Sequence, residues 1–456
     1  MVVRGGRIVR PDGIFEADMV VEGETIAGFL PSGGAPGPGD LDATGLYVMA
    51  GMIDPHVHLR DPGQEEKDDF VTGTAAAAIG GVTTVFDMPN TAPAVSTAAI
   101  LKAKADHLQP RALVDFALYG GAGASNLDTI AEQAEAGAIA FKSFMNAPAP
   151  SAGPDGLTRC LPDDHVFLAA MKRIATTGRP GVLHAENDAL CTGLARDLRA
   201  EGRNDPAAHG ESRPCFAEEE AVQRAILLAR EAGARISFAH VSTTGALRHI
   251  REAKRRGLQV TAEACPHHLL LNESILETKG PYGKINPPLR PESNRADLWN
   301  ALLDGTIDFI GTDHSPYTVA DKEPGWSEIW KATSGVHGLE TGLTVLLTEV
   351  VRGRMTLPSL TRLVSQNVAR IFSLPRKGAL VEGADADFVL VDLARKGRVD
   401  RGRLQSKSRD AARLWDGRET LAGIVATYVR GLEVARDGAL TARPGHGRWL
   451  TPSGER

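Results

Sequence analysis

Residues 236–265 read ISFAHVSTTGALRHIREAKRRGLQVTAEAC and contain the pattern that decides the fold. Two short apolar runs, ISFAHVS and QVTAEAC, flank a segment in which Ala, Leu, Glu and Arg recur at helical spacing. The same form recurs along the chain in the runs GVTTVFDM, VDFALYGG, IAFKSFM, GVLHAE and IDFIGTD. This alternation over about 325 residues predicts an α/β protein with a TIM-type (β/α)8 barrel, whose chemistry lies at the C-terminal ends of the strands. A doubly wound sheet is the alternative, but no GxGxxG or GxxxxGK[ST] phosphate loop follows a first strand.

Both ends of the chain have a different pattern from the middle. Residues 1–48 and 377–440 consist of short apolar runs split by Gly, Pro and Asp, which is typical of small antiparallel strands. We therefore expect a small β-sandwich-like domain built from both ends, a barrel over residues 49–376, and a C-terminal tail at 441–456. The stretch MNAPAPSAGPDG, Met145–Gly156, fits a lid loop and a plain connector equally well.

Composition excludes several classes of protein. The chain has 456 residues, of which 42% are hydrophobic and 24% charged, so it is neither disordered nor fibrous. Lys and Arg number 51 against 57 Asp and Glu, which leaves a net charge of -6 and no basic field for nucleic acid. Four cysteines without a CxxC pair argue against a disulfide scaffold, and no apolar segment is long enough for a signal peptide core or a membrane span. We expect a cytoplasmic protein with neither nucleic acid nor membrane as partner.

Histidines and one aspartate stand where the predicted strands end. His56 and His58 are two residues apart, and alternation along a strand puts both imidazoles on one face, where they can hold one metal. His184 follows GVL, His240 follows ISFA, and Asp313 follows IDFIGT. These five side chains are candidate metal ligands at one end of a barrel.

Lys142, in IAFKSFM, is a cation among the apolar residues of a strand. Taken alone it fits a lysine that reaches out from a barrel rim. Beside strand-end histidines and an aspartate, a different state is favoured, in which the amine has reacted with CO2 to give a carbamate. A carbamate supplies anionic oxygen that bridges two divalent metals and removes a buried ammonium from their vicinity. The histidines in polar surroundings are interpreted as surface residues: His107, His165, His209, His249 and His446.

Several motifs follow one another in a specific order: GMIDPHVHLRDPG, DMPNTAP, the strand lysine, HAEN, AHVST, CPHHLLL, INPPLR and TDHSP. In this order they resemble the cyclic amidase branch of the amidohydrolase superfamily, which includes dihydroorotases, allantoinases and hydantoinases, over nearly the whole chain. Ala50 stands where the first motif usually has a leading Pro. The resemblance implies a binuclear zinc site with His56, His58 and Asp313 on one metal and His184 and His240 on the other. Carbamylated Lys142 and a hydroxide lie between the metals in such enzymes.

The resemblance also implies the reaction. Two divalent metals, most simply Zn²⁺, lower the pKa of a bridging water and polarise the amide carbonyl of a small cyclic amide. Asp313 would take the proton of the hydroxide and pass it to the leaving ring nitrogen, giving a ring-opened carbamoyl or ureido acid.

Four further residues bear on the choice of ring. Arg60, Asn90 and Asn286 match positions that contact substrate in dihydroorotases, where Arg60 and Asn90 would bind its carboxylate. Ala147 replaces a tyrosine expected in hydantoinases. Tyr317, however, replaces the last His of the DHAPH motif of dihydroorotases, and DHSP is closer to allantoinases. The sequence therefore favours reversible dihydroorotate hydrolysis in pyrimidine biosynthesis, with allantoinase or hydantoinase and dihydropyrimidinase-like activity as the alternative.

Two other classes of protein are alternatives. Some members of the superfamily have lost metal ligands and act as scaffolds, but every expected ligand is present here. Mononuclear deaminases use a similar set without the carbamate, so Lys142 favours two metals. Family likeness further implies a homodimer or homotetramer.

Overall fold

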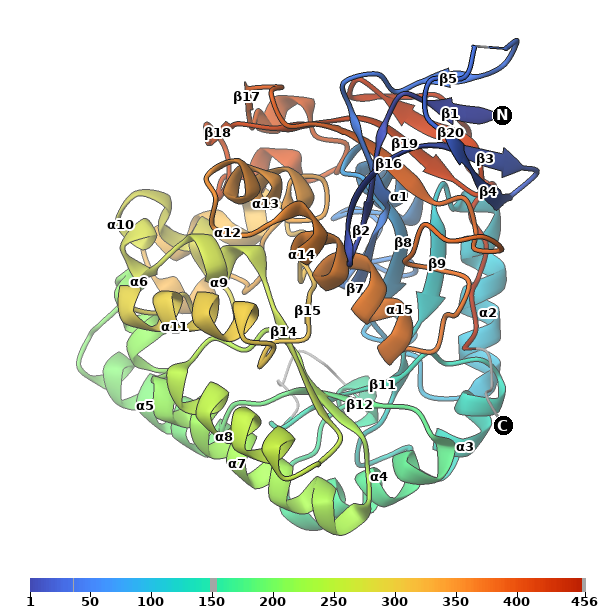
Figure 1. Ribbon diagram of the computed structural model, residues 1–456. Coiled ribbons are helices and arrows are strands. Elements are labelled where there is room, and N and C mark those ends of the chain that lie inside the picture. The colour runs from blue at the N-terminus through green and yellow to red at the C-terminus, as the bar shows by residue number, and fades with distance from the viewer. Residues whose placement is uncertain (36, 148–153, 453–456) are drawn as a thin grey trace.

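Parallel strands form the wall of a barrel in the computed structural model, which describes residues 1–35, 37–147 and 154–452 (Figure 1). Within these residues the wall has eight strands: β7 (Met52–Val57), β8 (Val82–Asp87), β9 (Asp115–Leu118), β11 (Phe141–Phe144), β12 (Gly181–His184), β13 (Ile236–Phe238), β14 (Val260–Ala264) and β15 (Phe309–Ile310). A short strand, β10 (Gly120–Gly121), follows β9 and pairs with β11. Half of the stretch Met145–Gly156, predicted as a lid loop or a connector, lies outside the described residues.

The barrel closes at both places where the strand pairing is interrupted. The amide of Ile139 donates to the carbonyl of Leu118 at 2.9 Å and so links β9 to the segment before β11. A parallel bridge between Val57 and His314 joins the ends of β7 and β15. The (β/α)8 barrel predicted from the alternating pattern is confirmed.

Helices surround the barrel, one after each strand of the wall. The outer ring consists of α1 (Phe70–Ile79), α2 (Ala98–Leu108), α3 (Ile130–Glu135), α4 (Asp164–Thr177), α7 (Cys215–Ala232), α8 (Thr244–Arg255), α11 (Glu292–Leu303) and α13 (Gly342–Val351). Shorter helices belong to the connections: α5 (Asp188–Ala200), α6 (Pro206–Glu211), α9 (Pro266–Leu270), α10 (Leu276–Lys279), α12 (Val319–Lys322), α14 (Leu357–Thr361) and α15 (Asn367–Ile371).

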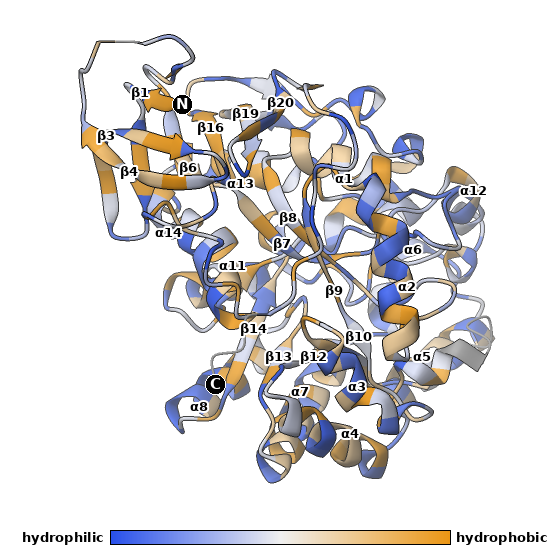
Figure 2. Cartoon of the chain, turned by 90° about the vertical axis from the view of Figure 1, so that its right-hand side faces the viewer, coloured by the Kyte–Doolittle hydropathy of each residue, from blue (hydrophilic) through white to orange (hydrophobic). Residues whose placement is uncertain are grey.

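The unit β13–α8–β14 shows why the sequence folds in this way. All three residues of β13 are buried, and Thr243 caps α8 by accepting a hydrogen bond from the amide of Ala246. The buried side of α8 carries Ala246, Leu247, Ile250 and Ala253, at the spacing of one helical face. Figure 2 shows the result, with mainly hydrophobic strands inside and outer helices such as α4 that carry both colours.

Strands from the two chain ends form one ten-stranded sheet beside the barrel (Figure 1). Its strands are β1 (Val2–Arg4), β2 (Arg7–Arg10), β3 (Gly13–Glu22), β4 (Thr25–Pro31), β5 (Leu41–Asp42), β6 (Tyr47–Ala50), β16 (Phe388–Asp392), β19 (Gly423–Val429), β20 (Leu432–Arg436) and β21 (Ala439–Leu440). The central pair is β6 with β16, so the N-terminal and C-terminal halves share a continuous ladder. A separate pair, β17 (Gly397–Arg398) with β18 (Glu419–Thr420), lies in the connection between β16 and β19.

The sheet is fixed to the barrel at two points. Gly51 joins β6 directly to β7, and a Cβ atom there would lie 2.2 Å from Cγ2 of Thr83, so this junction requires glycine. Lys377 is buried, and its Nζ lies 2.5 Å from Asp115 at the start of β9 and 2.6 Å from Asp387 just before β16. Asp385 completes this ionic cluster at 2.9 Å. Such a buried network is costly to break, because its members cannot be resolvated individually.

The C-terminal segment returns to the barrel after the sheet. The amide of Phe116 in β9 donates to the carbonyl of Arg448, and a parallel bridge joins Phe116 to Trp449. None of the described helices is long and apolar enough to cross a membrane.

Candidate active site

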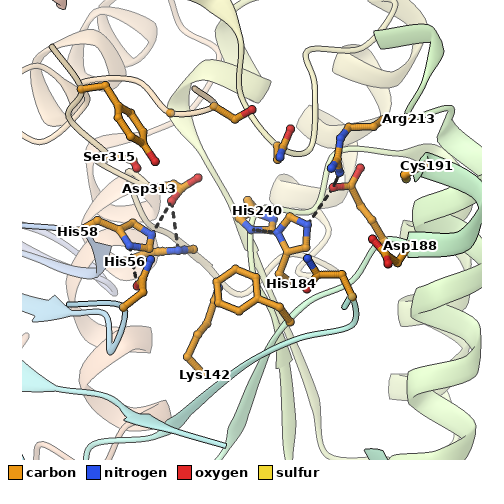
Figure 3. Close-up of a pocket in the computed structure, with 18 of the residues that line it drawn as sticks. His56, His58, Lys142, His184, Asp188, Cys191, Arg213, His240, Asp313 and Ser315 are labelled. Atoms are coloured by element: carbon orange, nitrogen blue, oxygen red, sulfur yellow. Dashed lines mark hydrogen bonds and ion pairs between the residues drawn. The ribbon is translucent and has the colours of Figure 1, made fainter. Parts of the chain in front are cut away.

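The predicted metal ligands all line one cavity of about 210 Å³ at the C-terminal ends of the barrel strands (Figure 3). They come from β7, β11 and β12 and from the residues just after β7, β13 and β15: His56, His58, Lys142, His184, His240 and Asp313. The barrel geometry therefore brings together side chains that are up to 257 positions apart in sequence, since Asp313 and His56 differ by 313 − 56.

One group of donors gathers around Asp313. Its Oδ1 lies 3.2 Å from Nε2 of His56 and 3.3 Å from Nε2 of His58. His240 approaches the same group, and ligand atoms of His56, His240 and Asp313 lie within 4.8 Å of one another. Asp313 and His240 have positive φ angles of 48° and 39°, a region that costs non-glycine residues free energy and is concentrated at functional sites.

A second group is formed by two imidazoles that face each other. Nδ1 of His184 lies 3.0 Å from Nε2 of His240, and the ring centroids are 4.7 Å apart. In Figure 3, His184 and His240 lie across the cavity from His56, His58 and Asp313.

Lys142 is fully buried in β11, and its Nζ has no hydrogen-bond partner among the described residues. Its Nζ is 5.2 Å from the centre of the Phe144 ring. Burial lowers the pKa of Lys142 to about 8, although nearby Asp313 and Glu263 act in the opposite direction. A buried cation without a partner is unfavourable, and the neutral amine is the form that reacts with CO2.

Three polar side chains behind the histidines fix their orientation. Glu263 in β14 is 2% exposed, and its Oε1 lies 2.9 Å from Nδ1 of His56 and accepts from the amide of His240 at 3.1 Å. Oδ1 of Asn90 lies 3.0 Å from Nδ1 of His58, and Oε2 of Glu186 lies 2.9 Å from Nε2 of His184. Such partners fix the tautomer and the ring orientation of metal-binding histidines.

Burial also keeps imidazoles in the metal-binding form. It lowers the pKa of His58 to about 3 and that of His240 well below its usual value. At neutral pH these rings are uncharged and offer a lone pair.

The donor set fits a divalent metal centre. Imidazole nitrogens and a carboxylate oxygen converge on one cavity, their outer atoms are engaged by Glu263, Asn90 and Glu186, and an unpaired lysine amine is buried beside them. In a two-metal arrangement one ion would be held by His56, His58 and Asp313, the other by His184 and His240, with Lys142 as a carbamate supplying oxygen to both.

The four residues considered for substrate contact also line the cavity. Arg60 is buried, and it donates from Nη2 to Oγ of Ser315 at 2.5 Å and from Nε to the carbonyl of Pro316 at 3.2 Å. Its guanidinium also lies 4.4 Å from the centre of the Tyr317 ring. Oδ1 of Asn286 is buried without a hydrogen-bond partner, which leaves it available to a ligand.

Sequence analysis missed Glu263, Glu186 and Arg213. Glu263 is an acid inside an otherwise apolar strand, and Glu186 belongs to the HAEN motif, so both carried a signal. Arg213 pairs with Glu186 and lines the cavity, but it lies in the connection between α6 and α7 and belongs to no strand or motif that would indicate a role. His209 was expected at the surface but is 4% exposed, because α6 packs it inward, where its Nε2 bonds to the carbonyl of Ile285 at 2.9 Å.

The model of the Amidohydrolase family matches residues 47–434, which include the whole barrel. The chain belongs to the amidohydrolase family. This amidohydrolase is 37% identical to L-hydantoinase of Paenarthrobacter aurescens over 455 residues, covering 99% of this chain and 98% of the relative. It is 36% identical to allantoinase of Deinococcus radiodurans over 454 residues, again covering 99% and 98%.

Solved structures agree with this assignment. L-Hydantoinase (dihydropyrimidinase) from Arthrobacter aurescens superposes with a TM-score of 0.94 at 36% identity and 99% coverage of both chains. Dihydropyrimidinase from Brevibacillus agri gives 0.91 at 30% identity, with 100% of this amidohydrolase and 99% of that chain covered.

Proposed function

We propose that this amidohydrolase is a zinc-dependent hydrolase that opens hydantoin-type rings, which are five-membered cyclic ureides, to carbamoyl amino acids. The observation that carries the proposal is the convergence of four histidines, Asp313 and an unpaired buried lysine on one cavity. Hydrolysis of a cyclic amide is the reaction that such a set is suited to, because it needs an activated water and a polarised carbonyl.

The choice of ring rests on chemistry shared by the relatives. Allantoin is itself a hydantoin with a ureido group on the ring carbon, so the allantoinase and hydantoinase relatives act on one ring type. This supports the alternative of the sequence analysis in preference to dihydroorotate. The neighbouring contacts engage both residues only in part, because Arg60 donates from Nε and Nη2 to Pro316 and Ser315, and Asn90 faces His58 through Oδ1 alone. They do not distinguish a ring with a carboxylate from one without, so the choice of ring rests on the relatives.

When bound, the metal ions supply Lewis-acid activation of a water molecule and of the ring carbonyl. The side chain of Asp313 lines the cavity beside His56 and His58, which both contact its Oδ1, so its other carboxylate oxygen is placed to accept the proton of the attacking water. The same carboxyl then donates that proton to the ring nitrogen as the amide C–N bond breaks. Asn286, with an unpaired Oδ1 in the cavity wall, is positioned to accept a hydrogen bond from a ring N–H.

A substrate panel tests this proposal. Protein reconstituted with zinc and bicarbonate is assayed with hydantoin, allantoin, dihydrouracil and dihydroorotate. We expect kcat/KM to be highest for one of the two hydantoin rings, and a clear preference for dihydroorotate would reject the ring assignment.

The metal centre is tested separately by Lys142→Ala. We expect this variant to lose most of its bound zinc and its turnover, whereas Lys172→Ala, on the exposed face of α4, keeps both. Because the substitution leaves space in which a short carboxylate can supply the missing oxygens, added propionate should restore part of the zinc content. A Lys142→Ala protein with unchanged zinc and turnover would exclude a bridging carbamate.

A further inference from the structure

A second cavity, of about 510 Å³, opens beside the catalytic one. The two cavities share Cys191, Arg213, Asn286 and Ser334 in their linings, so a ligand in the first has direct access to the second. One wall of the second cavity is the face of α5 that carries Arg196 and Arg199. In Figure 3 this side of the site begins at Arg213 and Cys191, beyond His184.

The second cavity is lined by cations. Arg196, Arg199, Arg213 and Lys284 contribute to it, and none of its lining residues in the described chain is acidic. Two of the four charges are neutralised from outside, Arg213 by Glu186 and Arg196 by Asp197.

The other two charges have no carboxylate partner in the described part of the chain. Lys284 is 7% exposed, and among the described residues its Nζ donates to the carbonyls of Ile329 and Ala332, at 2.8 and 2.6 Å. The guanidinium of Arg199 lies 4.8 Å from the centre of the Trp330 ring, a contact that holds its position and leaves its N–H groups free. The cavity therefore carries an excess of about two positive charges, from these two side chains.

This excess charge is unfavourable until an anion enters. Burial lowers the pKa of Lys284 to about 8, and the charges of Arg213 and Arg199 lower it further. His209, also in the lining, has a pKa lowered to about 3 by burial and adds no charge at neutral pH. A carboxylate in this cavity would gain charge-assisted hydrogen bonds from donors that now lack an ionic partner.

We propose that the second cavity is a subsite for an acidic substituent on the ring carbon, so that the enzyme prefers hydantoins derived from acidic amino acids. This inference rests on the proposed function, because it assumes that the hydantoin ring occupies the first cavity. A substituent of two methylene groups ending in a carboxylate leaves the ring at the shared residues and brings its anion among Arg199, Arg213 and Lys284.

The test compares two substrates of nearly equal shape, 5-(2-carboxyethyl)hydantoin and 5-(2-carbamoylethyl)hydantoin. We expect kcat/KM for the acid to exceed that for the amide by about tenfold, the range of one charge-assisted contact in a partly solvated site. In Arg199→Gln this preference should fall to about threefold or less, because the variant lacks a charge that distinguishes the acid from the amide. Arg199→Lys should retain most of it.

Arg248→Gln is the matched control, because Arg248 is an exposed arginine on α8 that lines neither cavity, so the variant has the same net charge as Arg199→Gln. Equal kcat/KM for acid and amide, or the same loss of preference in the control, would overturn the subsite. Calorimetric measurement of the binding of both compounds to zinc-free protein tests the subsite separately from the proposed hydrolysis of hydantoins. If no ring is hydrolysed, the proposed function fails, yet an Arg199-dependent preference in binding still supports the subsite and equal binding rejects it.

Discussion

Glu263→Gln offers a sharp test of how the barrel positions its metal ligands. The carboxylate of Glu263 accepts from Nδ1 of His56 and from the amide of His240, at 2.9 and 3.1 Å, and is 2% exposed. Glutamine has the same shape and keeps an acceptor oxygen, so the two contacts survive as hydrogen bonds to a neutral group. Hydrogen bonds to charged groups contribute about 1.5 to 3 kcal/mol and neutral ones about 0.5 to 1.5. Two weakened contacts therefore cost about 2 to 3 kcal/mol.

Part of this loss appears in metal binding, because an imidazole that donates to a carboxylate is a better ligand through its other nitrogen. We expect Glu263→Gln to bind zinc about 10- to 100-fold more weakly than the parent protein, the usual range for such supporting groups. The assay is competition for zinc against a fluorescent chelator, with kcat/KM for hydantoin measured at saturating zinc.

The control is Glu349→Gln on α13. Glu349 is also a buried carboxylate with two partners, Arg352 at 2.8 Å and Arg354 at 3.3 Å, but it lies outside the site cavity. It should lose thermal stability without losing zinc affinity. Zinc affinity within twofold of the parent in Glu263→Gln would refute the positioning role of Glu263.

Three other predictions concern substrate charge, pH and stability. Arg60→Met should lower kcat/KM more for dihydroorotate than for hydantoin, since only the former carries a carboxylate, and equal losses would contradict this. Burial raises the pKa of Glu340 from 4.5 to about 7, so the folded chain holds this proton where the unfolded chain releases it. The stabilising effect of this proton is thus present at low pH and is lost as pH rises through 7. Between pH 5 and 8, urea unfolding should show the free energy of unfolding of the parent protein falling by about 2 to 3 kcal/mol relative to that of Glu340→Gln. Lys377→Met removes the cation shared by three buried carboxylates, of which Asp115 and Asp385 keep Arg430 and Arg376 as partners, and should lower the free energy of unfolding by about 3 to 5 kcal/mol. Lys331→Met, at an exposed pair, should change it by less than about 1 kcal/mol.

The barrel and its donor set were accessible from sequence because both have a local signature. Each apolar run is a strand whose end faces the same mouth, so His184, His240 and Asp313 were marked by position alone. Closure of the wall by the bridge between Val57 and His314, and the return of the tail to Phe116, have no such signature. They are contacts between segments distant in the chain, and the sequence of neither segment indicates which other segment it contacts.

The residues considered for substrate contact show a different limit. Arg60 and Asn90 do line the cavity, but Arg60 bonds to Ser315 and Pro316, and Asn90 faces His58. A polar residue at the mouth of a barrel can serve the ligand or the wall itself, and its identity does not distinguish these roles. Only the hydrogen-bond partners of that residue in the structure distinguish these roles. The metal ligands could therefore be predicted from sequence more readily than the ring of the substrate.

This distinction separates the elements that bear on chemistry from those that bear on specificity. The metal-binding candidates come from barrel strand ends, whose positions are fixed by the ladder between neighbouring strands. The second cavity is lined largely by α5 and by the segments around Lys284 and Trp330, none of which is a strand of the barrel. Substitutions on α5 can therefore alter the charge that meets a ring substituent without moving the strand ends. If so, Arg199 variants should change the order of preferred hydantoins while zinc content and kcat for unsubstituted hydantoin stay constant, and a parallel fall in all three would show that the two parts of the site are not independent.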